Sequence, residues 1–380
     1  MSSARTIWTW WTGWSWSAEE LKLKKMDIRT TIIDPEKDGR WDHFVEQHAF
    51  GWISHLSGWK HVLENSFKHM QGHYLALMQG ETIRAALPVY EVRSRIMGNR
   101  LVSVPFATIS DPLVSSGKDM ALLLDAAKEI SARIDANFME IRAFSSSMYI
   151  QEDRPEKVEN YKHHYIVLDR PLDTISKTFH RSCVRQRIAR SLKSGITFEP
   201  GETDIDLKQF YNLYLTNRKR LSLPPQPYLF IKSLWDTFHP SKKITLLMAR
   251  KDGALIGCLM LFRFKGRVSA EFAAYDDSYL NISPLHGMFW EAIQTAQLEG
   301  YRIFDFGRTS LDNSTLMDFK GRWGTEVTGL PQFYFLPDHS TKKVKVKNGS
   351  FGKQVFGRIC KFAPRPLYIW MGNLLYRHMG

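Results

Sequence analysis

The order in which strand-like and helix-like segments follow one another is the feature that most restricts the fold of this chain. In the first half, apolar runs typical of strands and apolar residues at helical spacing predict strand, helix, helix, three strands, helix and strand. These segments lie at residues 30–33, 35–47, 57–67, 74–78, 83–93, 102–107, 121–134 and 138–142. Strands mixed with helices in this way predict an α/β unit.

The second half repeats this order with the same kinds of element. Its strands are expected at residues 165–168, 196–199, 244–251, 255–264, 268–275, 303–307 and 333–336, and its helices at 174–192, 207–221, 228–238 and 285–299. A chain of 380 residues is also too long for one ordinary core. We therefore expect two similar units in tandem, at residues 26–150 and 151–341, with a polar hinge around residues 145–161.

The net charge of +13 is concentrated at the two ends of the chain. Residues 342–380 hold nine basic residues and no acid, and residues 1–25 contribute a further +2, which leaves only +2 for everything between. A nucleic-acid-binding domain usually carries its charge on the folded surface that meets the phosphates. The nearly neutral body therefore argues against DNA or RNA as a partner.

The basic tail, residues 342–380, also carries aromatic and aliphatic side chains, a composition typical of segments that lie on a membrane surface. Its most apolar stretch, Leu367–Tyr376, is shorter than the 18 or so apolar residues that span a bilayer. As a helix starting after Pro364 and Pro366, it could lie in the interface with Trp370 at headgroup depth, while the lysines meet anionic lipid. Packing of the same helix against the body is an equal alternative.

The first 25 residues have a different character, because five tryptophans stand among Thr, Ser and Gly: Trp8, Trp10, Trp11, Trp14 and Trp16. They form no helical or alternating apolar face. The segment also lacks the basic start and the A-x-A site of a secretory signal. We expect this leader, residues 1–25, to be disordered or not native, with the folded protein beginning at Met26.

The cysteine and histidine patterns exclude several kinds of chemistry. Only Cys183, Cys258 and Cys360 are present, without a CxxC pair, so we expect neither a disulfide framework nor a zinc site. The 13 histidines show no HxxxH pair, and metal catalysis is not expected. No G-x-S-x-G elbow occurs either. We therefore expect no covalent enzyme intermediate and no bound cofactor.

One stretch, Phe304–Ser310 followed by Asp318–Gly324, combines apolar strand residues with charges that a buried strand normally avoids. On a strand, Asp305 points away from its two phenylalanine neighbours, so the aromatic rings can fill the core while the carboxylate faces the other side. Gly307 lets a backbone or ligand approach closely, and Arg308 offers a planar fork for a carboxylate or phosphate. We expect a functional site here.

These residues resemble the FDFGRS…FKxxWG motif of FemAB-like proteins, which are tandem GNAT-fold acyl- or aminoacyltransferases. The resemblance is greatest to the branch associated with exosortase/PEP-CTERM and exopolysaccharide systems. The basic stretch His180–Ile196 and the strand Ser103–Phe106 are similar to the same family, and the likeness covers residues 26–340. It implies an α/β (α+β) fold of two GNAT-like domains with mixed, mainly antiparallel sheets, and acyl transfer by direct attack on an activated acyl group.

Three charged residues of the motif are the expected centre of this chemistry. In the resembling enzymes the Phe-Lys lysine is implicated near the acyl donor, and we expect Lys320 to stabilise the oxyanion that acyl transfer develops. Asp305 is expected to orient the substrate or to act as a general base, and Arg308 to anchor an anionic substrate group. The alternatives are an ion pair between Asp305 and Arg308 that fixes the loop, and an ordinary surface lysine at position 320.

The expected helix 174–192 is strongly basic. Val184, Ile188 and Leu192 form a stripe at helical spacing that predicts its core face. Arg181 and Arg185 lie on another face, where like charges four residues apart repel each other. We therefore include both arginines in substrate binding, with an anionic partner in mind; a solvated basic face is the alternative.

Four more residues are expected to bind substrate: Trp323, Tyr275, Arg218 and His286. Trp323 belongs to the motif itself. Arg218 precedes a Leu-Pro-Pro segment that resembles the acceptor-side loop of the family. His286 lies in the stretch Ser278–Gly287, where acetyl-CoA-dependent GNAT enzymes place a glycine-rich loop at a helix N-terminus to hold the pyrophosphate.

That stretch departs from the glycine-rich pattern, because only Gly287 is available. The donor is therefore left open between acyl-CoA and aminoacyl-tRNA as co-substrate. We expect a cytoplasmic acyltransferase, peripheral at the inner face of the cytoplasmic membrane, that acylates an amine or hydroxyl of a lipid-linked, cell-envelope or exopolysaccharide precursor. The alternative is a non-catalytic scaffold of a polysaccharide or exosortase-linked export system that has lost donor binding.

Overall fold

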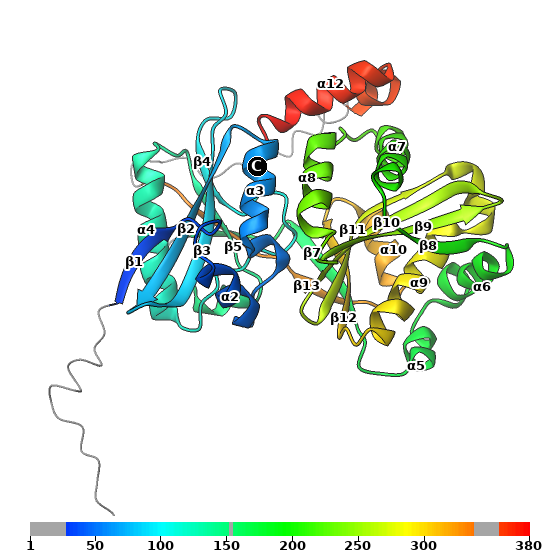
Figure 1. The fold of residues 1–380 in the computed structure, drawn as a ribbon, viewed down its shortest axis with the longest axis horizontal. Coiled ribbons are helices and arrows are strands. Elements are labelled where there is room, and N and C mark those ends of the chain that lie inside the picture. Colours follow the sequence, from blue (N-terminus) through cyan, green and yellow to red (C-terminus); the bar gives the residue numbers. More distant parts are fainter. Residues whose placement is uncertain (1–27, 152–154, 338–356) are drawn as a thin grey trace, which may run out of the picture.

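The computed structural model describes residues 28–151, 155–337 and 357–380. The Trp-rich leader and the lysine cluster at residues 342–353 lie outside these ranges, so the expectations for them stay predictions. Figure 1 shows two α/β units side by side, each built on one seven-stranded sheet. Most neighbouring strands in both sheets are antiparallel, and one pair in each sheet is parallel. The predicted fold class is confirmed.

The first sheet has the strand order β1-β2-β3-β4-β5-β14-β6. The strands are β1 Ile28–Ile33, β2 Met70–Gln79, β3 Thr82–Val92, β4 Arg100–Ser103, β5 Met139–Arg142, β14 Gln332–Phe335 and β6 Glu156–Val158. Its helices are α2 Arg40–Gln47, α3 Ser57–Ser66 and α4 Gly117–Arg133, with short turns η1 Ile53–His55 and η2 Ser145–Tyr149. Because side chains alternate along a strand, Tyr74 and Ala76 of β2 pack with α2 and α3, while Leu75 and Leu77 pack with α4.

The second sheet has the order β13-β7-β12-β11-β10-β9-β8. Its strands are β13 Glu326–Gly329, β7 Tyr161–Val167, β12 Ile303–Ser310, β11 Arg267–Tyr275, β10 Ala254–Phe264, β9 Ile244–Lys251 and β8 Thr197–Gly201. The helices are α5 Leu172–Lys177, α6 Gln186–Lys193, α7 Asp204–Arg220, α8 Tyr228–Phe238, α9 Pro284–Leu298 and α10 Ser314–Gly321, with turns η3 Arg181–Arg185 and η4 Asp277–Ile282. On β10, Cys258 and Met260 face α7 and α8, whereas Leu259 and Leu261 face α9.

The two units share one hydrophobic core at their junction. Helix α3 of the first unit packs on α8 of the second, and the ring of Trp59 lies 6.1 Å from that of Phe238 and 6.0 Å from that of Phe262. Gly58 permits this approach, because a Cβ there would lie 2.7 Å from the side chain of Thr237. This packing fixes the position of the first unit relative to the second, so residues on the two sides of the junction can form one site.

The strand expected at residues 333–336 belongs to the other sheet. It was expected in the second unit, but β14 (Gln332–Phe335) lies in the first sheet between β5 and β6. Its Tyr334 hydroxyl and the Gln332 amide both donate to Glu140 of β5, at 3.2 and 3.0 Å. These buried hydrogen bonds fix β14 in the first sheet. The first unit is therefore completed by a strand that follows the strands of the second unit in the sequence.

The long helix expected at residues 174–192 is broken. The structure has α5, a wide π-type turn η3, and then α6. The predicted core stripe holds for Val184 and Ile188, but Leu192 is 53% exposed. Ser191 faces α9 instead, where Gly287 has no side chain; a Cβ on Gly287 would lie 2.1 Å from the Ser191 hydroxyl. Gly287 therefore permits a close contact between α6 and α9.

The C-terminal helix α12 (Arg365–Tyr376) packs across the junction of the two units, above α8 in Figure 1. The Tyr376 ring lies 5.5 Å from that of Phe106 in the first unit, and the Tyr368 hydroxyl donates to the carbonyl oxygen of Leu223 in the second at 2.6 Å. Packing against the body is thus found for the inner face of this helix. Within the described residues, no helix combines the length and apolar character needed to cross a bilayer.

Candidate active site

The sheet of the second unit opens between β11 and β12. These neighbouring parallel strands pair only at their first residues, Arg267–Ser269 with Ile303–Asp305, although β11 continues to Tyr275 and β12 to Ser310. At Gly307 the pairing of β12 with β7 also shifts, and the positive φ of 72° there is a conformation that favours glycine. The separated strands leave backbone groups and side chains of β11 and β12 available for a site.

Asp305 is fully buried at the point where the strands separate. Its Oδ2 accepts hydrogen bonds from His163 Nε2 at 2.7 Å and Arg267 Nη1 at 2.8 Å, and its Oδ1 accepts from the backbone N–H of Gly307 at 2.6 Å. Burial alone would raise the pKa of Asp305, but these partners hold it far below its usual range. The carboxylate stays charged and fixes the bend in β12.

This arrangement bears on two roles considered for Asp305. Both oxygens of the carboxylate already accept hydrogen bonds from His163, Arg267 and Gly307, which favours a structural role over a general base. The ion pair considered with Arg308 is also absent from the described residues, because Arg267 of the neighbouring strand and His163 of β7 take that place. Neither partner could be named from the sequence, since both come from other strands.

Lys320 approaches the same bend from α10. Its Nζ donates to the carbonyl oxygens of Gly307 at 2.9 Å and Arg308 at 3.1 Å, and the residue is only 6% exposed. The alternative of an ordinary surface lysine is therefore excluded. Burial lowers the pKa of Lys320 to about 8, opposed by the nearby carboxylates of Asp305 and Glu271. A charged ammonium has three N–H donors, so one remains for a ligand.

Glu271, in the middle of β11, is a candidate that the sequence reasoning missed. Its Oε1 accepts a hydrogen bond from the Ser269 hydroxyl at 2.7 Å, and its Oε2 accepts one from the Thr108 hydroxyl of the first unit at 3.1 Å. Burial raises the pKa of Glu271, and the carboxylate of Asp305 adds to this effect. The sequence does place a single acidic residue in the expected strand 268–275. That pattern does not distinguish a functional carboxylate from an exposed acid on the surface of the sheet.

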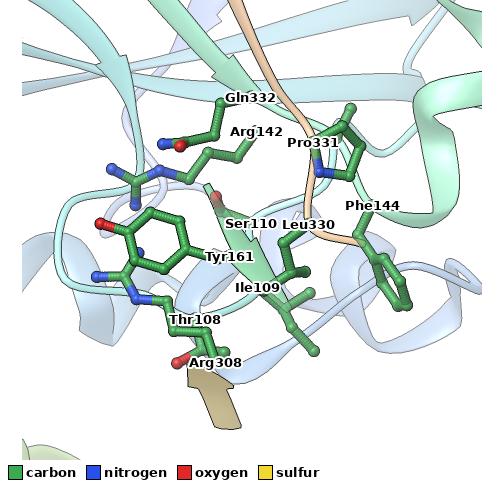
Figure 2. Close-up of a pocket in the computed structure, with 11 residues that line it drawn as sticks. Thr108, Ile109, Ser110, Arg142, Phe144, Tyr161, Arg308, Leu330, Pro331 and Gln332 are labelled. Atoms are coloured by element: carbon green, nitrogen blue, oxygen red, sulfur yellow. The ribbon is translucent and has the colours of Figure 1, made fainter. Parts of the chain in front are cut away.

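Arg308 lines a small pocket between the two units (Figure 2). Its guanidinium lies 4.9 Å from the centre of the Tyr161 ring. Arg142, from β5 of the first unit, lies beside it and pairs through Nε with Glu140 at 2.7 Å. Burial and the charge of Arg142 lower the pKa of Arg308. The remaining lining residues are Thr108, Ile109, Ser110, Ala143, Phe144, Leu330, Pro331 and Gln332.

Two of the expected substrate-binding residues lie in the core of the second unit. Trp323 is fully buried, with ring centres 5.2 Å from Phe179 and 5.8 Å from His286, which stacks on it. Burial and the charge of Arg187 lower the pKa of His286 to about 4, so its ring is neutral at pH 7. These two side chains pack α9 against α10, and neither lines the pocket of Arg308.

The other four expected residues lie apart from the motif. Arg181 and Arg185 are exposed on the η3 turn. Arg218 donates from Nε and Nη2 to the carbonyl oxygen of Pro224 at 3.1 and 2.7 Å, which closes the loop after α7. The ring of Tyr275 lies 4.9 Å below the guanidinium of Arg220. The structure therefore brings together Asp305, Arg308 and Lys320 from the predicted set, and adds Glu271. No cluster of three or more His, Cys, Asp or Glu side chains suited to a metal occurs in the described residues.

Comparisons with known proteins agree with this architecture. Residues 178–320 match the family model described as an acetyltransferase (GNAT) domain. The UDP-N-acetylmuramoylpentapeptide-lysine N(6)-alanyltransferase of Weissella viridescens is 21% identical over 297 residues, which are 73% of this chain and 85% of that relative. The crystal structure of FemX matches with a TM-score of 0.68 and 15% identity, over 82% of this chain and 98% of FemX.

A tandem GNAT protein from the clavulanic acid biosynthesis pathway is also similar, with a TM-score of 0.52 and 12% identity over 83% of this chain and 100% of that protein. The fold is thus the FemAB-like tandem GNAT fold that the motif resemblance predicted. Assignment to the exosortase-associated branch stays a prediction.

Proposed function

We propose that this chain, an acyltransferase with a FemAB-like tandem GNAT fold, transfers an activated acyl or aminoacyl group to an amine or hydroxyl of a cell-envelope precursor. The observation that carries the proposal is the opening between β11 and β12, where Glu271 of β11 is held by the Ser269 and Thr108 hydroxyls and the buried Lys320 is held at the Gly307 bend of β12. The alanyltransferase relative, which by its name acts on a UDP-linked muramoyl pentapeptide, supports an envelope precursor as acceptor. An exopolysaccharide precursor is the finer form of this proposal.

In the proposed reaction the acceptor nitrogen or oxygen attacks the carbonyl carbon of the donor directly. Glu271 takes the proton from the attacking group, a role that suits a carboxyl group whose pKa is raised by desolvation. The new C–N or C–O bond forms first and gives a tetrahedral intermediate; the bond to the leaving thiol or hydroxyl then breaks, and the proton ends on that leaving group. No covalent enzyme intermediate is required.

Lys320 is proposed to stabilise the oxyanion of the tetrahedral intermediate. Two of its N–H groups are held by the carbonyl oxygens of Gly307 and Arg308, so the third has a fixed direction before substrate binds. A donor fixed in a dry site needs no reorganisation as charge develops, and such donors typically contribute about 10²- to 10³-fold to the rate. Asp305 is proposed to act indirectly, by holding the Gly307 bend on which Lys320 depends.

For the donor, acyl-CoA and aminoacyl-tRNA both remain within the proposal. The tight packing of Gly287 against Ser191 weakens the case for a pyrophosphate loop at the start of α9. The exposed arginines of η3, Arg181 and Arg185, are proposed to meet an anionic part of the donor, because no acid of the same turn neutralises them.

The donor can be identified by thermal unfolding of the full chain with acyl-CoAs and aminoacyl-tRNAs, while nucleotide-linked sugars test the acceptor side. One donor class should raise the melting temperature by a few degrees, since a ligand bound only to the native state stabilises it. Glu271→Gln should keep this shift and lose about 10²-fold or more in transfer rate. Absence of a shift with every donor would favour the scaffold alternative, and full transfer by Glu271→Gln would remove Glu271 as the base.

We also propose that the enzyme works at the inner face of the cytoplasmic membrane. The helices after residue 356 bury one face in the body and expose apolar side chains on the other: Ile359, Phe362, Leu367, Trp370 and Leu374. Four basic residues accompany them, Arg358, Lys361, Arg365 and Arg377, and residues 357–380 contain no acid. Apolar burial combined with about 1 kcal/mol per basic residue near anionic lipid is the chemistry of a membrane-surface helix.

Phe362→Ser combined with Trp370→Ser should weaken binding to vesicles of phosphatidylcholine and phosphatidylglycerol by more than about tenfold, because both rings leave the interface. The two side chains are 77% and 58% exposed, so the fold should persist. Leu298→Ser, at an 83% exposed position on α9, is the matched control. Vesicle flotation is the measurement, and equal flotation of the double variant and the control would contradict the membrane proposal.

A further inference from the structure

The guanidinium of Arg308 lacks an anionic partner. Its side chain makes no ion pair and no hydrogen bond with any described residue, and its guanidinium lies 4.9 Å from the centre of the Tyr161 ring. The residue is partly buried between the two units. Placing a charge there without a partner costs free energy, which a bound anion would offset.

The charge balance of the pocket fits an anion with a single negative charge. Arg142 and Arg308 are the charged residues in its lining. The charge of Arg142 is already neutralised by Glu140, through the 2.7 Å contact of Arg142 Nε with Glu140 Oε1. Arg308 is therefore the charge in the lining that has no ion pair, and because the carboxylate of Glu271 also acts on it, a ligand with one negative charge is better balanced than a dianionic phosphate monoester.

Two further polar groups in the lining also lack partners. The Ser110 hydroxyl and the Gln332 carbonyl oxygen have no hydrogen-bond partner among the described residues, although both residues are more than nine-tenths buried. In Figure 2, Arg142, Tyr161 and Arg308 gather on one side of the pocket, and Phe144, Leu330 and Pro331 on the other. The pocket thus offers an apolar wall, a hydroxyl donor and an unpaired guanidinium, a combination suited to the flat end group of a larger molecule.

We propose that this pocket, formed by both units, binds a carboxylate of the acceptor substrate. A carboxylate carries one charge and can accept two parallel N–H bonds from a guanidinium. The link to the acceptor is Thr108, which lines the pocket and whose hydroxyl also donates to Glu271 at 3.1 Å. A molecule anchored at Arg308 thereby presents its other end close to the proposed base, which acts on the acceptor. The inference rests on the proposed function and narrows the acceptor to a carboxylate-bearing compound.

N-acetylglycine and N-acetylglycinamide are a probe pair that differs only in the carboxylate. By titration calorimetry of the full chain, the acid should bind at least about tenfold more tightly than the amide and more tightly than inorganic phosphate. Arg308→Gln should abolish that preference, while Arg308→Lys retains part of it, because a lysine keeps the charge and loses the fork. Arg95→Gln, an exposed arginine of the first unit, should bind as wild type does.

Equal binding of acid and amide by the wild type, or tighter binding of phosphate, would overturn the inference. So would an unchanged acid preference in Arg308→Gln. These outcomes are distinct from failure of the proposed function, because they leave transfer from the donor and its dependence on Glu271 intact. Conversely, loss of the acid preference in Arg308→Gln supports the carboxylate site even if no donor tried is turned over.

Discussion

Lys320→Ala is expected to lower the rate of acyl transfer by about 10² to 10³, because it removes the one fixed donor proposed for the oxyanion. The loss should fall on kcat more than on KM, since the charge that Lys320 stabilises develops only in the transition state. Steady-state kinetics with the identified donor is the measurement. Lys118→Ala, at an exposed position of α4, should retain the wild-type rate.

The protonation of Lys320 also predicts an upper pH limit for the rate of acyl transfer. Burial lowers the pKa of Lys320 to about 8, so the ammonium is charged below that pH and neutral above it. Transfer should therefore decline as the pH rises through about 8, and Lys320→Arg should move this decline to higher pH because arginine stays protonated. Lys320→Met keeps an apolar side chain of similar length, so it removes the charge with less risk of unfolding the protein than Lys320→Ala. Wild-type turnover in a folded Lys320→Met variant would remove the lysine from the mechanism.

Asp305→Asn is expected to reduce the free energy of unfolding by about 2–3 kcal/mol, because it removes the buried charge that accepts hydrogen bonds from His163 and from the partly buried Arg267. Chemical denaturation at neutral pH measures the loss. The matched control is Asp252→Asn, whose side chain is 82% exposed in its pair with Lys251; loss of such a surface pair should cost less than about 1 kcal/mol.

The pH dependence of this effect has a definite sign. The pKa of Asp305 is far below its usual range in the folded protein, so its contribution to stability is complete above the unfolded pKa of about 4 and is lost as the pH falls below it. The difference between wild type and Asp305→Asn should therefore narrow in acid. A difference that stays constant down to about pH 2 would show that the carboxylate charge is not what stabilises the bend.

The motif could be found from sequence because its signals are local. A strand with one acid between two phenylalanines, followed by glycine, predicts aromatic rings in the core and a special backbone position at the glycine, and Phe304 and Phe306 are buried while Gly307 has a positive φ. The tandem arrangement could be predicted for the same reason, because both units show the same order of strands and helices. Lys320 was identified by family resemblance, whereas its burial depends on how α10 lies over β12.

The partners of these residues could not be predicted, because they are contributed by distant parts of the chain. Glu271 depends on Thr108, 163 positions away, and Asp305 depends on His163, 142 positions away. The substrate-binding role of Trp323 was inferred from its place in the motif, but a conspicuous aromatic residue in a turn looks the same whether it faces a ligand or the core. Only the packing of α9 against α10 distinguishes the two.

The position of β14 has a consequence for how the chain matures on the ribosome. Strand β6 pairs with β14 and with no other described strand, yet about 175 residues separate them in the chain. At the usual 5–20 residues per second, the nascent first unit therefore waits roughly ten to thirty seconds for its last internal strand. During that interval the edge of β5 is unpaired. The speed at which the second half of the chain is translated, and the access of chaperones in that time, therefore affect how much of the first unit folds correctly.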